Sequence, residues 1–212
     1  MDFMEIEKKR CTVRNFSGQQ VPDELLKKIL EAGRWAPTAV NAQPQRILVL
    51  NTQETLGKVR EFCTFGYRKE YEELAKESAD QKSGKSVYYY GAPVVLMVCW
   101  DKTACWTHPE SGDSSGLVDA TIVATHMMLE AASLDVGSAW ISYFDKKKAR
   151  NLLEIPDNWE IGSLLYLGYP SEDFKPNTNL SGKRKPLTET CFYNAPGIEL
   201  PMNYAYPAGS AY

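Results

Sequence analysis

Apolar runs and one-sided helical stripes alternate along the chain, and this alternation predicts the order of its elements. Pro22, followed by two acids, opens a helical stripe that Ala36-Pro37 ends. Apolar runs predict strands at 47–50, 94–100, 138–144 and 161–169. Further helices are predicted over 52–79 with a break near Gly66, over 119–134 with Gly137 closing it, and over 146–154 with Asp145 as its cap.

The unbroken apolar strands indicate a sheet that is covered on both faces, because they leave no polar side for water. The predicted fold class is therefore α+β, loosely a three-layer α-β-α sandwich. A chain of 212 residues suits one core, and residues 1–193 are expected to form it. Residues 194–212 have no helical or strand period, so this tail is expected to be disordered or to lie on another surface.

Composition excludes several classes of partner. The net charge of −3 gives no reason to expect a nucleic acid or an anionic membrane. The charged start lacks the apolar core of a signal peptide, and the longest apolar run, 94–100, is too short to span a bilayer. Five scattered cysteines without a CxxC pair indicate reduced thiols. We therefore expect a soluble cytoplasmic protein.

The common catalytic and phosphate-binding signatures are absent. There is no GxGxxG after a strand, no GxxxxGK[ST], no GxSxG and no HExxH. The two histidines, His108 and His126, are far apart, and His126 lies within an apolar helix where packing is its expected role. No metal site and no histidine-based triad is predicted.

Four polar segments remain as candidates for chemistry. Residues 9–16 crowd three cations and a hydroxyl, which suits either a solvated basic stretch or an anion site. On a helical turn, Arg10 and Arg14 would share a face. Residues 36–45 form a helix-to-strand turn, in which Asn41 and Gln43 would need polar partners if buried. The others are 138–145, where a strand enters a capped helix, and the basic stretch 182–187.

In their order and spacing these segments resemble the nitroreductase family of FMN (flavin mononucleotide) enzymes. The motif Arg-x-Ser/Thr-x-Arg/Lys-x-Phe matches residues 10–16, and Ala-Pro-Ser/Thr-x-x-Asn-x-Gln-Pro matches 36–44. Later matches are Trp-Ile-x-x-Phe-Asp at 140–145, Leu-Gly-Tyr-Pro at 167–170 and Arg-Lys-Pro-Leu at 184–187. The resemblance covers roughly residues 5–193 and implies a nitroreductase-like fold.

The resemblance also implies roles for individual residues. Arg10, Thr12 and Arg184 would hold the FMN phosphate, with Lys183 a weaker candidate, and Cys11 would contribute backbone. Arg14 would reach the pyrimidine edge of the flavin ring. Pro37, Thr38, Ala39 and Asn41 would come from the partner subunit, because the family buries FMN at a homodimer interface. Trp140, Ile141, Ser142 and Tyr143 would pass along the ring near N5. No side chain is assigned as a catalytic acid or base.

The resemblance implies hydride transfer from NADH or NADPH through FMN to an electron-poor acceptor such as a nitroaromatic or quinone, in a ping-pong scheme. Two alternatives stay open: an FMN storage or sensor protein without turnover, and a family offshoot with another flavin reaction such as reductive dehalogenation. Tyr143 replaces the glycine of many members and could crowd the flavin ring, and Gln45 replaces a bulky aromatic. No flavin contact is assigned within residues 52–86. The tail 194–212 could wrap the partner subunit.

Overall fold

The computed structural model describes residues 2–63, 90–176 and 183–200. The chain divides into two compact units, Met1–Phe174 and Lys175–Tyr212, and each is described by itself. Within the described ranges, no helix has both the length and the apolar character needed to cross a membrane.

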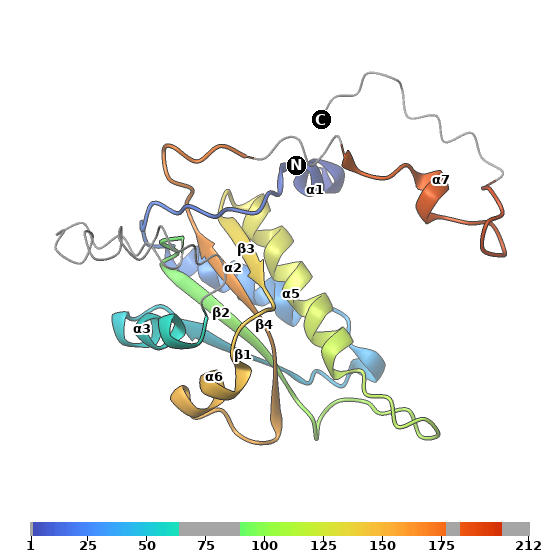
Figure 1. Cartoon of the computed structure of the whole chain (residues 1–212), viewed down its shortest axis with the longest axis horizontal. Coiled ribbons are helices and arrows are strands. Elements are labelled where there is room, and N and C mark those ends of the chain that lie inside the picture. Colours follow the sequence, from blue (N-terminus) through green and yellow to red (C-terminus); the bar gives the residue numbers. More distant parts are fainter. Residues whose placement is uncertain (1, 64–89, 177–182, 201–212) are drawn as a thin grey trace. The chain divides into compact units, whose positions relative to one another are not determined.

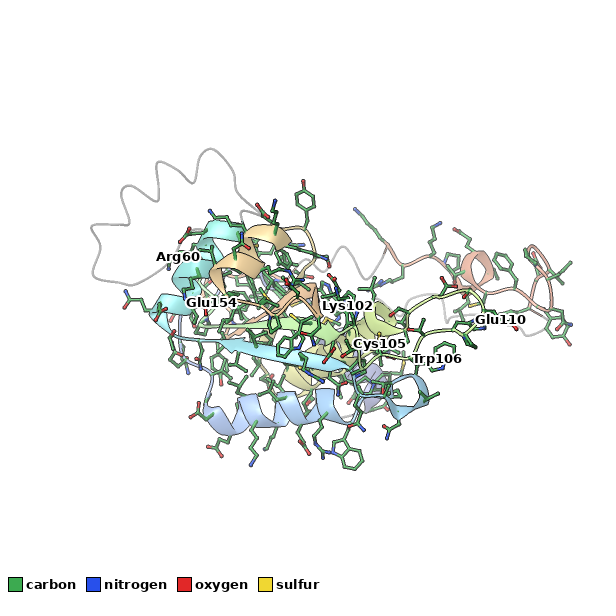
Figure 2. All side chains as sticks on the ribbon, turned by 90° about the horizontal axis from the view of Figure 1, so that it is seen from below. Arg60, Lys102, Cys105, Trp106, Glu110 and Glu154 are labelled. Carbon is green, nitrogen blue, oxygen red and sulfur yellow. The ribbon has the colours of Figure 1, made fainter. Side chains whose placement is uncertain are left out.

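An antiparallel sheet forms the middle layer of the first unit, with its strands in the order β1-β2-β4-β3 (Figure 1). Its strands are β1 (Gln45–Leu50), β2 (Val94–Asp101), β3 (Gly137–Ile141) and β4 (Trp159–Gly168). All four are predicted, but β3 ends at Ile141 instead of 144. The chain leaves the sheet there because the Asp145 N–H donates to the Phe62 carbonyl oxygen at 2.9 Å, which turns it into the next helix.

Successive residues of the central strands pack on opposite faces of the sheet. One buried cluster contains Val95, Met97 and Cys99, whereas the other contains their neighbours Val94, Leu96 and Val98. Strand β2 is apolar without interruption over residues 94–100 because both of its faces are covered.

Helices cover both faces (Figure 1). On one face lie α3 (Gln53–Phe62) and α6 (Lys146–Leu152), which bury Val59 and Ala149 in the first cluster. On the other lie α2 (Asp23–Arg34) and α5 (Gly116–Ser133), which bury Ile29 and Met127 in the second. The Asp145 carboxylate caps α6 by accepting from the Lys148 N–H at 2.9 Å. The predicted α+β fold with three layers is confirmed.

Several predicted details need correction. The helix expected over 52–79 is described only as α3, and residues 64–79, with the expected break at Gly66, lie outside the described residues. Gly137 does not close α5, because Asp135 takes the left-handed position after the helix (φ 60°) and Gly137 already belongs to β3. A helix that was not predicted, α1 (Phe3–Lys9), precedes the first motif, and Lys9 Nζ lies 2.6 Å from Asp135 Oδ1.

The second unit is described over residues 175–176 and 183–200. It contains the short helix α7 (Leu187–Thr190), beside which Lys185 Nζ lies 3.9 Å from Glu189 Oε2. Residues 201–212 of the predicted tail lie outside the described residues.

Candidate functional site

The first motif forms what we call the cationic segment (residues 10–16), and it runs along the outer edge of β3. Thr12 forms a parallel bridge with Ser138, and the Val13 N–H donates to the Ser138 carbonyl oxygen at 2.9 Å. Further along, Phe16 forms an antiparallel bridge with Pro170. The segment is therefore extended, not helical, because backbone bonds to two other segments outweigh a local turn. It links the first motif to the start of β3 and to the Leu-Gly-Tyr-Pro run.

Gly137 allows this close approach. A Cβ atom at Gly137 would lie 2.7 Å from Cγ2 of Val13 and 3.1 Å from the carbonyl oxygen of Gly168. Both distances are too short for any side chain to fit without movement of the segment or the strand. Sequence reasoning assigned Gly137 to a helix end and missed this role, since a close contact between distant segments leaves no local signal.

The apolar side chains of the cationic segment are buried, and its polar side chains are at least partly exposed. Val13 and Phe16 are 1% and 2% exposed, whereas Arg10 and Thr12 are half-buried and Arg14 is exposed. Among the described residues, no acid forms an ion pair with Arg10 or Arg14. Alternate side chains of an extended chain point the same way, so both arginines share a side with the Thr12 hydroxyl. Two unpaired guanidinium groups and a hydroxyl suit an anion such as a phosphate.

Cys11 lies between these groups as a half-buried free thiol. Burial raises the pKa of Cys11, and the nearby Arg10 offsets that effect only in part. The thiol therefore stays protonated near neutral pH, which fits the expectation that Cys11 serves the site through its backbone.

The end of β3 carries the third motif. Trp140 is half-buried and Ile141 is 4% exposed, so both anchor the strand, and the Trp140 indole N–H donates to Ser142 Oγ at 2.9 Å. Tyr143, by contrast, is 82% exposed. Because Thr12 pairs with Ser138, the cationic segment and this motif lie along the same strand. The structure thus brings the first and third motifs together.

The second motif forms the amide loop (residues 36–45), which contains the short 3₁₀ helix η1 (Ala39–Asn41). Its backbone is left-handed at Val40 (φ 49°), Asn41 (φ 58°) and Gln43 (φ 49°), a conformation uncommon outside glycine. Thr38 Oγ1 closes the loop by accepting from the Gln43 N–H at 3.1 Å. Asn41 and Gln43 are exposed in the single chain, which corrects the idea that burial forces polar partners on them.

A residue outside all four motifs holds this loop. The Asp119 carboxylate, only 2% exposed, accepts from the Ala39 N–H at 2.9 Å and from Ser115 Oγ at 2.7 Å. Sequence reasoning counted Asp119 only as the start of a helix. The available signal was an acid near the start of an otherwise apolar helix, where a carboxylate needs partners if it is buried.

The amide loop and the cationic segment lie near opposite ends of α5, as Figure 1 shows. The loop is bonded to Asp119 in the first turn, whereas the cationic segment follows α1, whose Lys9 pairs with Asp135 just beyond the last turn. At 1.5 Å per residue, Asp119 and Ser133 are about 21 Å apart along the helix. The structure therefore does not bring the second motif to the first within one chain.

The fourth motif lies in the second unit. Lys183 and Arg184 are both exposed, and neither pairs with an acid among the described residues. They are available to an anion. Their placement beside the cationic segment stays a prediction.

Comparisons with known proteins identify the family. The model of the nitroreductase family matches residues 8–169. A crystal structure of a nitroreductase family protein from Clostridium difficile 630 is 32% identical, with a TM-score of 0.77 over 92% of this chain and 99% of that chain. An iodotyrosine deiodinase from Thermotoga neapolitana is 29% identical over 177 residues, or 81% of this chain and 90% of that protein.

A crystal structure from Desulfovibrio desulfuricans, in complex with FMN, shares the fold with a TM-score of 0.62 at 23% identity, over 92% of this chain and 98% of that chain. The range matched by the family model contains the cationic segment, the amide loop, and β3 with the exposed residues that follow it. It covers well over half of the 212 residues. The chain belongs to the nitroreductase family.

Proposed function

We propose that the protein is an FMN-dependent oxidoreductase that passes hydride from NADH or NADPH to an electron-poor acceptor such as a nitroaromatic or quinone. The observation that carries the proposal is the cationic segment on the edge of β3, where Arg10 and Arg14 flank Thr12 in an extended chain and form no ion pair with any acid among the described residues. This cluster fits the terminal monophosphate of FMN, because charge-assisted hydrogen bonds are strongest to such groups. Bound FMN would supply the chemistry by accepting hydride at its ring and giving it up again.

In this proposal the protein binds and orients, and no side chain acts as an acid or base. Arg10 and Thr12 hold the phosphate, and a contribution from Lys183 and Arg184 stays a prediction from the family resemblance. Arg14 places a permanent positive charge at the pyrimidine edge of the ring, where it stabilises the negative charge of the reduced state. The exposed residues 142 and 143, which follow β3, leave room for nicotinamide and acceptor to reach the same face in turn.

We further propose that the site is shared between two copies of the chain. The separation of the cationic segment and the amide loop along α5 supports this, because one subunit then lacks the loop at its own phosphate end. The outer face of α5 supports it too, since Leu117 and Val118 are 56% and 60% exposed. The Thr121 and Thr125 hydroxyls on this helix donate to their own backbone, to the carbonyl oxygens of residues 117 and 121, which favours burial of this face against a second copy.

Co-expression of two variants tests the shared site. Arg10→Ala and Asn41→Ala should each weaken FMN binding in a homodimer. In a mixed dimer one site carries both changes and the other carries neither, so about a quarter of all sites should regain tight binding. Flavin titration of the co-purified mixture measures this fraction. Absence of recovery would overturn the shared site.

Anaerobic stopped-flow mixing with NADH and with NADPH tests turnover. The purified protein should be yellow, should release FMN on heating, and should lose its flavin absorbance rapidly with at least one nicotinamide. Double-reciprocal plots with a nitroaromatic acceptor should then be parallel, as a ping-pong scheme requires. A flavin that stays oxidised with both nicotinamides would favour the storage alternative.

The similarity to an iodotyrosine deiodinase favours one second candidate, reductive dehalogenation of a halogenated phenol. The dithionite-reduced protein separates the two candidates when it is mixed with a nitroaromatic or with an iodinated phenol under anaerobic conditions. Release of iodide with flavin reoxidation would support the second candidate, and reoxidation by the nitroaromatic alone would support the first.

A further inference from the structure

We propose that Asp119 is a positioning residue, whose buried carboxylate holds the amide loop in the conformation that the flavin of the other subunit contacts. This inference rests on the proposed function. It assigns a role to a residue outside the four motifs, and it places the control of flavin binding partly in helix α5.

The contacts of Asp119 are those of a structural clamp. One carboxylate oxygen accepts from the Ala39 N–H at 2.9 Å and the other from Ser115 Oγ at 2.7 Å. With 2% of the residue exposed, water contributes little, so these two hydrogen bonds are what satisfies the buried carboxylate. Ala39 belongs to the amide loop and Ser115 is the N-cap of α5, so the carboxylate joins the loop to the start of the helix.

The amide loop needs such a clamp because its backbone is unfavourable by itself. Val40, a β-branched residue, has φ 49°, and Asn41 and Gln43 are also left-handed. Burial does not compensate for this strain, since the Val40 side chain is 75% exposed. A strained loop whose apolar tip remains in water is typical of a surface prepared for a ligand or partner.

The hydrogen-bonding role and the charge of Asp119 can be separated by substitution. Asp119→Asn keeps an oxygen for the Ala39 N–H, and the Ser115 hydroxyl can turn to accept from the new amide. Asp119→Ala removes both bonds and leaves two donors without their acceptor. Ser115→Ala leaves the bond to the loop in place. The expected order of FMN affinity is wild type, Asp119→Asn and Ser115→Ala within a few-fold, then Asp119→Ala about tenfold or more weaker.

Thr52→Ala is the matched control for stability. Thr52 caps α3 by accepting from the Thr55 N–H at 3.2 Å, so its loss weakens a helix on the other face of the sheet. It should lower the unfolding midpoint without changing FMN affinity measured well below that midpoint. A purely structural role for Asp119 would give the same result as this control.

Mixed dimers provide the sharper test. If Asp119 acts through the amide loop, Asp119→Ala should behave like Asn41→Ala: it should recover binding in about a quarter of sites when co-expressed with Arg10→Ala, and none when co-expressed with Asn41→Ala. Flavin titration of each co-purified mixture gives the fraction.

The possible results distinguish a failure of the proposed function from a failure of this inference. A wild-type protein that takes up no FMN would overturn the proposed function and this inference together. A wild type that binds FMN beside a folded Asp119→Ala of equal affinity would overturn the inference alone. Recovery of binding when Asp119→Ala is paired with Asn41→Ala would do the same, because the two residues would then serve different sites.

Discussion

The cationic segment and the amide loop are both short connecting stretches, but a different feature of each is fixed by the rest of the fold. In the cationic segment the backbone is bonded to β3 and to Pro170, while the arginine side chains lack acidic partners among the described residues. In the amide loop the backbone is left-handed and is clamped by the Asp119 carboxylate, while Val40 and Asn41 are exposed. One region offers side chains on a conventional backbone, and the other offers an unusual backbone.

This difference predicts how each region responds to change. A region that works through side-chain charge should lose ligand affinity when a charge is removed and keep its stability. A region that works through backbone geometry should depend on distant groups that hold that geometry. The informative positions to substitute are therefore the charged surface residues of the cationic segment and the buried residues that hold the amide loop.

The largest effect is expected for the charges. Arg10→Ala and Arg184→Ala should each weaken FMN binding about ten- to a hundredfold, since a hydrogen bond to a charged group is worth roughly 1.5–3 kcal/mol. The free energy of unfolding of the flavin-free protein should stay close to that of wild type. Fluorescence titration with FMN and urea unfolding measure the two quantities.

Lys28→Ala is the control, because Lys28 is an exposed cation on α2, a helix that contributes none of the proposed phosphate ligands. It should leave FMN affinity unchanged. If Arg10→Ala and Arg184→Ala both bind FMN as wild type does, the phosphate binds elsewhere and the cationic segment does not act through its charges.

The next largest effect is expected at Gly137, the residue of β3 against which the cationic segment packs. Gly137→Ala should cost about 1–3 kcal/mol of stability, because the added Cβ would lie 2.7 Å from Val13 Cγ2 and force the segment from β3. FMN affinity should fall as well. Gly57→Ala in α3 is the matched change, since a Cβ there meets no atom within 4 Å. It should be neutral or stabilise by up to about 1 kcal/mol. Equal denaturation midpoints for the two variants would refute the close approach.

The contrast between the regions also explains what sequence could predict. The strands and most helices follow from local periodicity, and the strand predicted at Val94–Trp100 is recognisable because its apolar side chains pack on one face of the sheet or the other. The boundary of β3 is not local. It depends on the bond from the Asp145 N–H to the Phe62 carbonyl oxygen, which joins residues far apart in sequence.

At the candidate site, sequence identified the residues with distinctive side chains and missed those that act through position. Arg10 and Arg14 were found by type and spacing, although their segment is extended. Gly137 and Asp119 were missed because each is defined by a contact with a distant segment: Val13 for the glycine and Ala39 for the carboxylate. Such contacts follow from tertiary packing and leave no motif.

A smaller effect is expected at Tyr143, just beyond β3, where neither charge nor backbone strain is involved. Tyr143 is 82% exposed, so Tyr143→Gly should leave FMN affinity unchanged. It should speed the oxidation of reduced flavin by bulky acceptors a few-fold more than by small ones, because a large ring near the flavin narrows access. Stopped-flow reoxidation with a graded series of quinones measures the ratio. An unchanged ratio would mean that Tyr143 points away from the acceptor.

The smallest effect tests the far end of the amide loop, where Asp101 holds the entry to β1. Its N–H donates to the Pro44 carbonyl oxygen at 2.8 Å, and its carboxylate lies 3.4 Å from Arg46 Nη2. Bonds from the Thr103 hydroxyl at 2.6 Å and the Thr103 N–H at 2.9 Å hold the pKa of Asp101 below its ordinary value of 3.8.

A pKa that is lower in the folded state stabilises the fold above the unfolded-state value and loses that stabilisation as pH falls through the folded-state value. Asp101→Asn should therefore be less stable than wild type by a gap that is constant from neutral pH to about pH 4 and narrows below it. Thr103→Val, which removes the strongest donor, should move the narrowing to higher pH. Urea unfolding across this range measures both. A gap that persists unchanged in acid would show that the charge of Asp101 is not what stabilises the entry to β1.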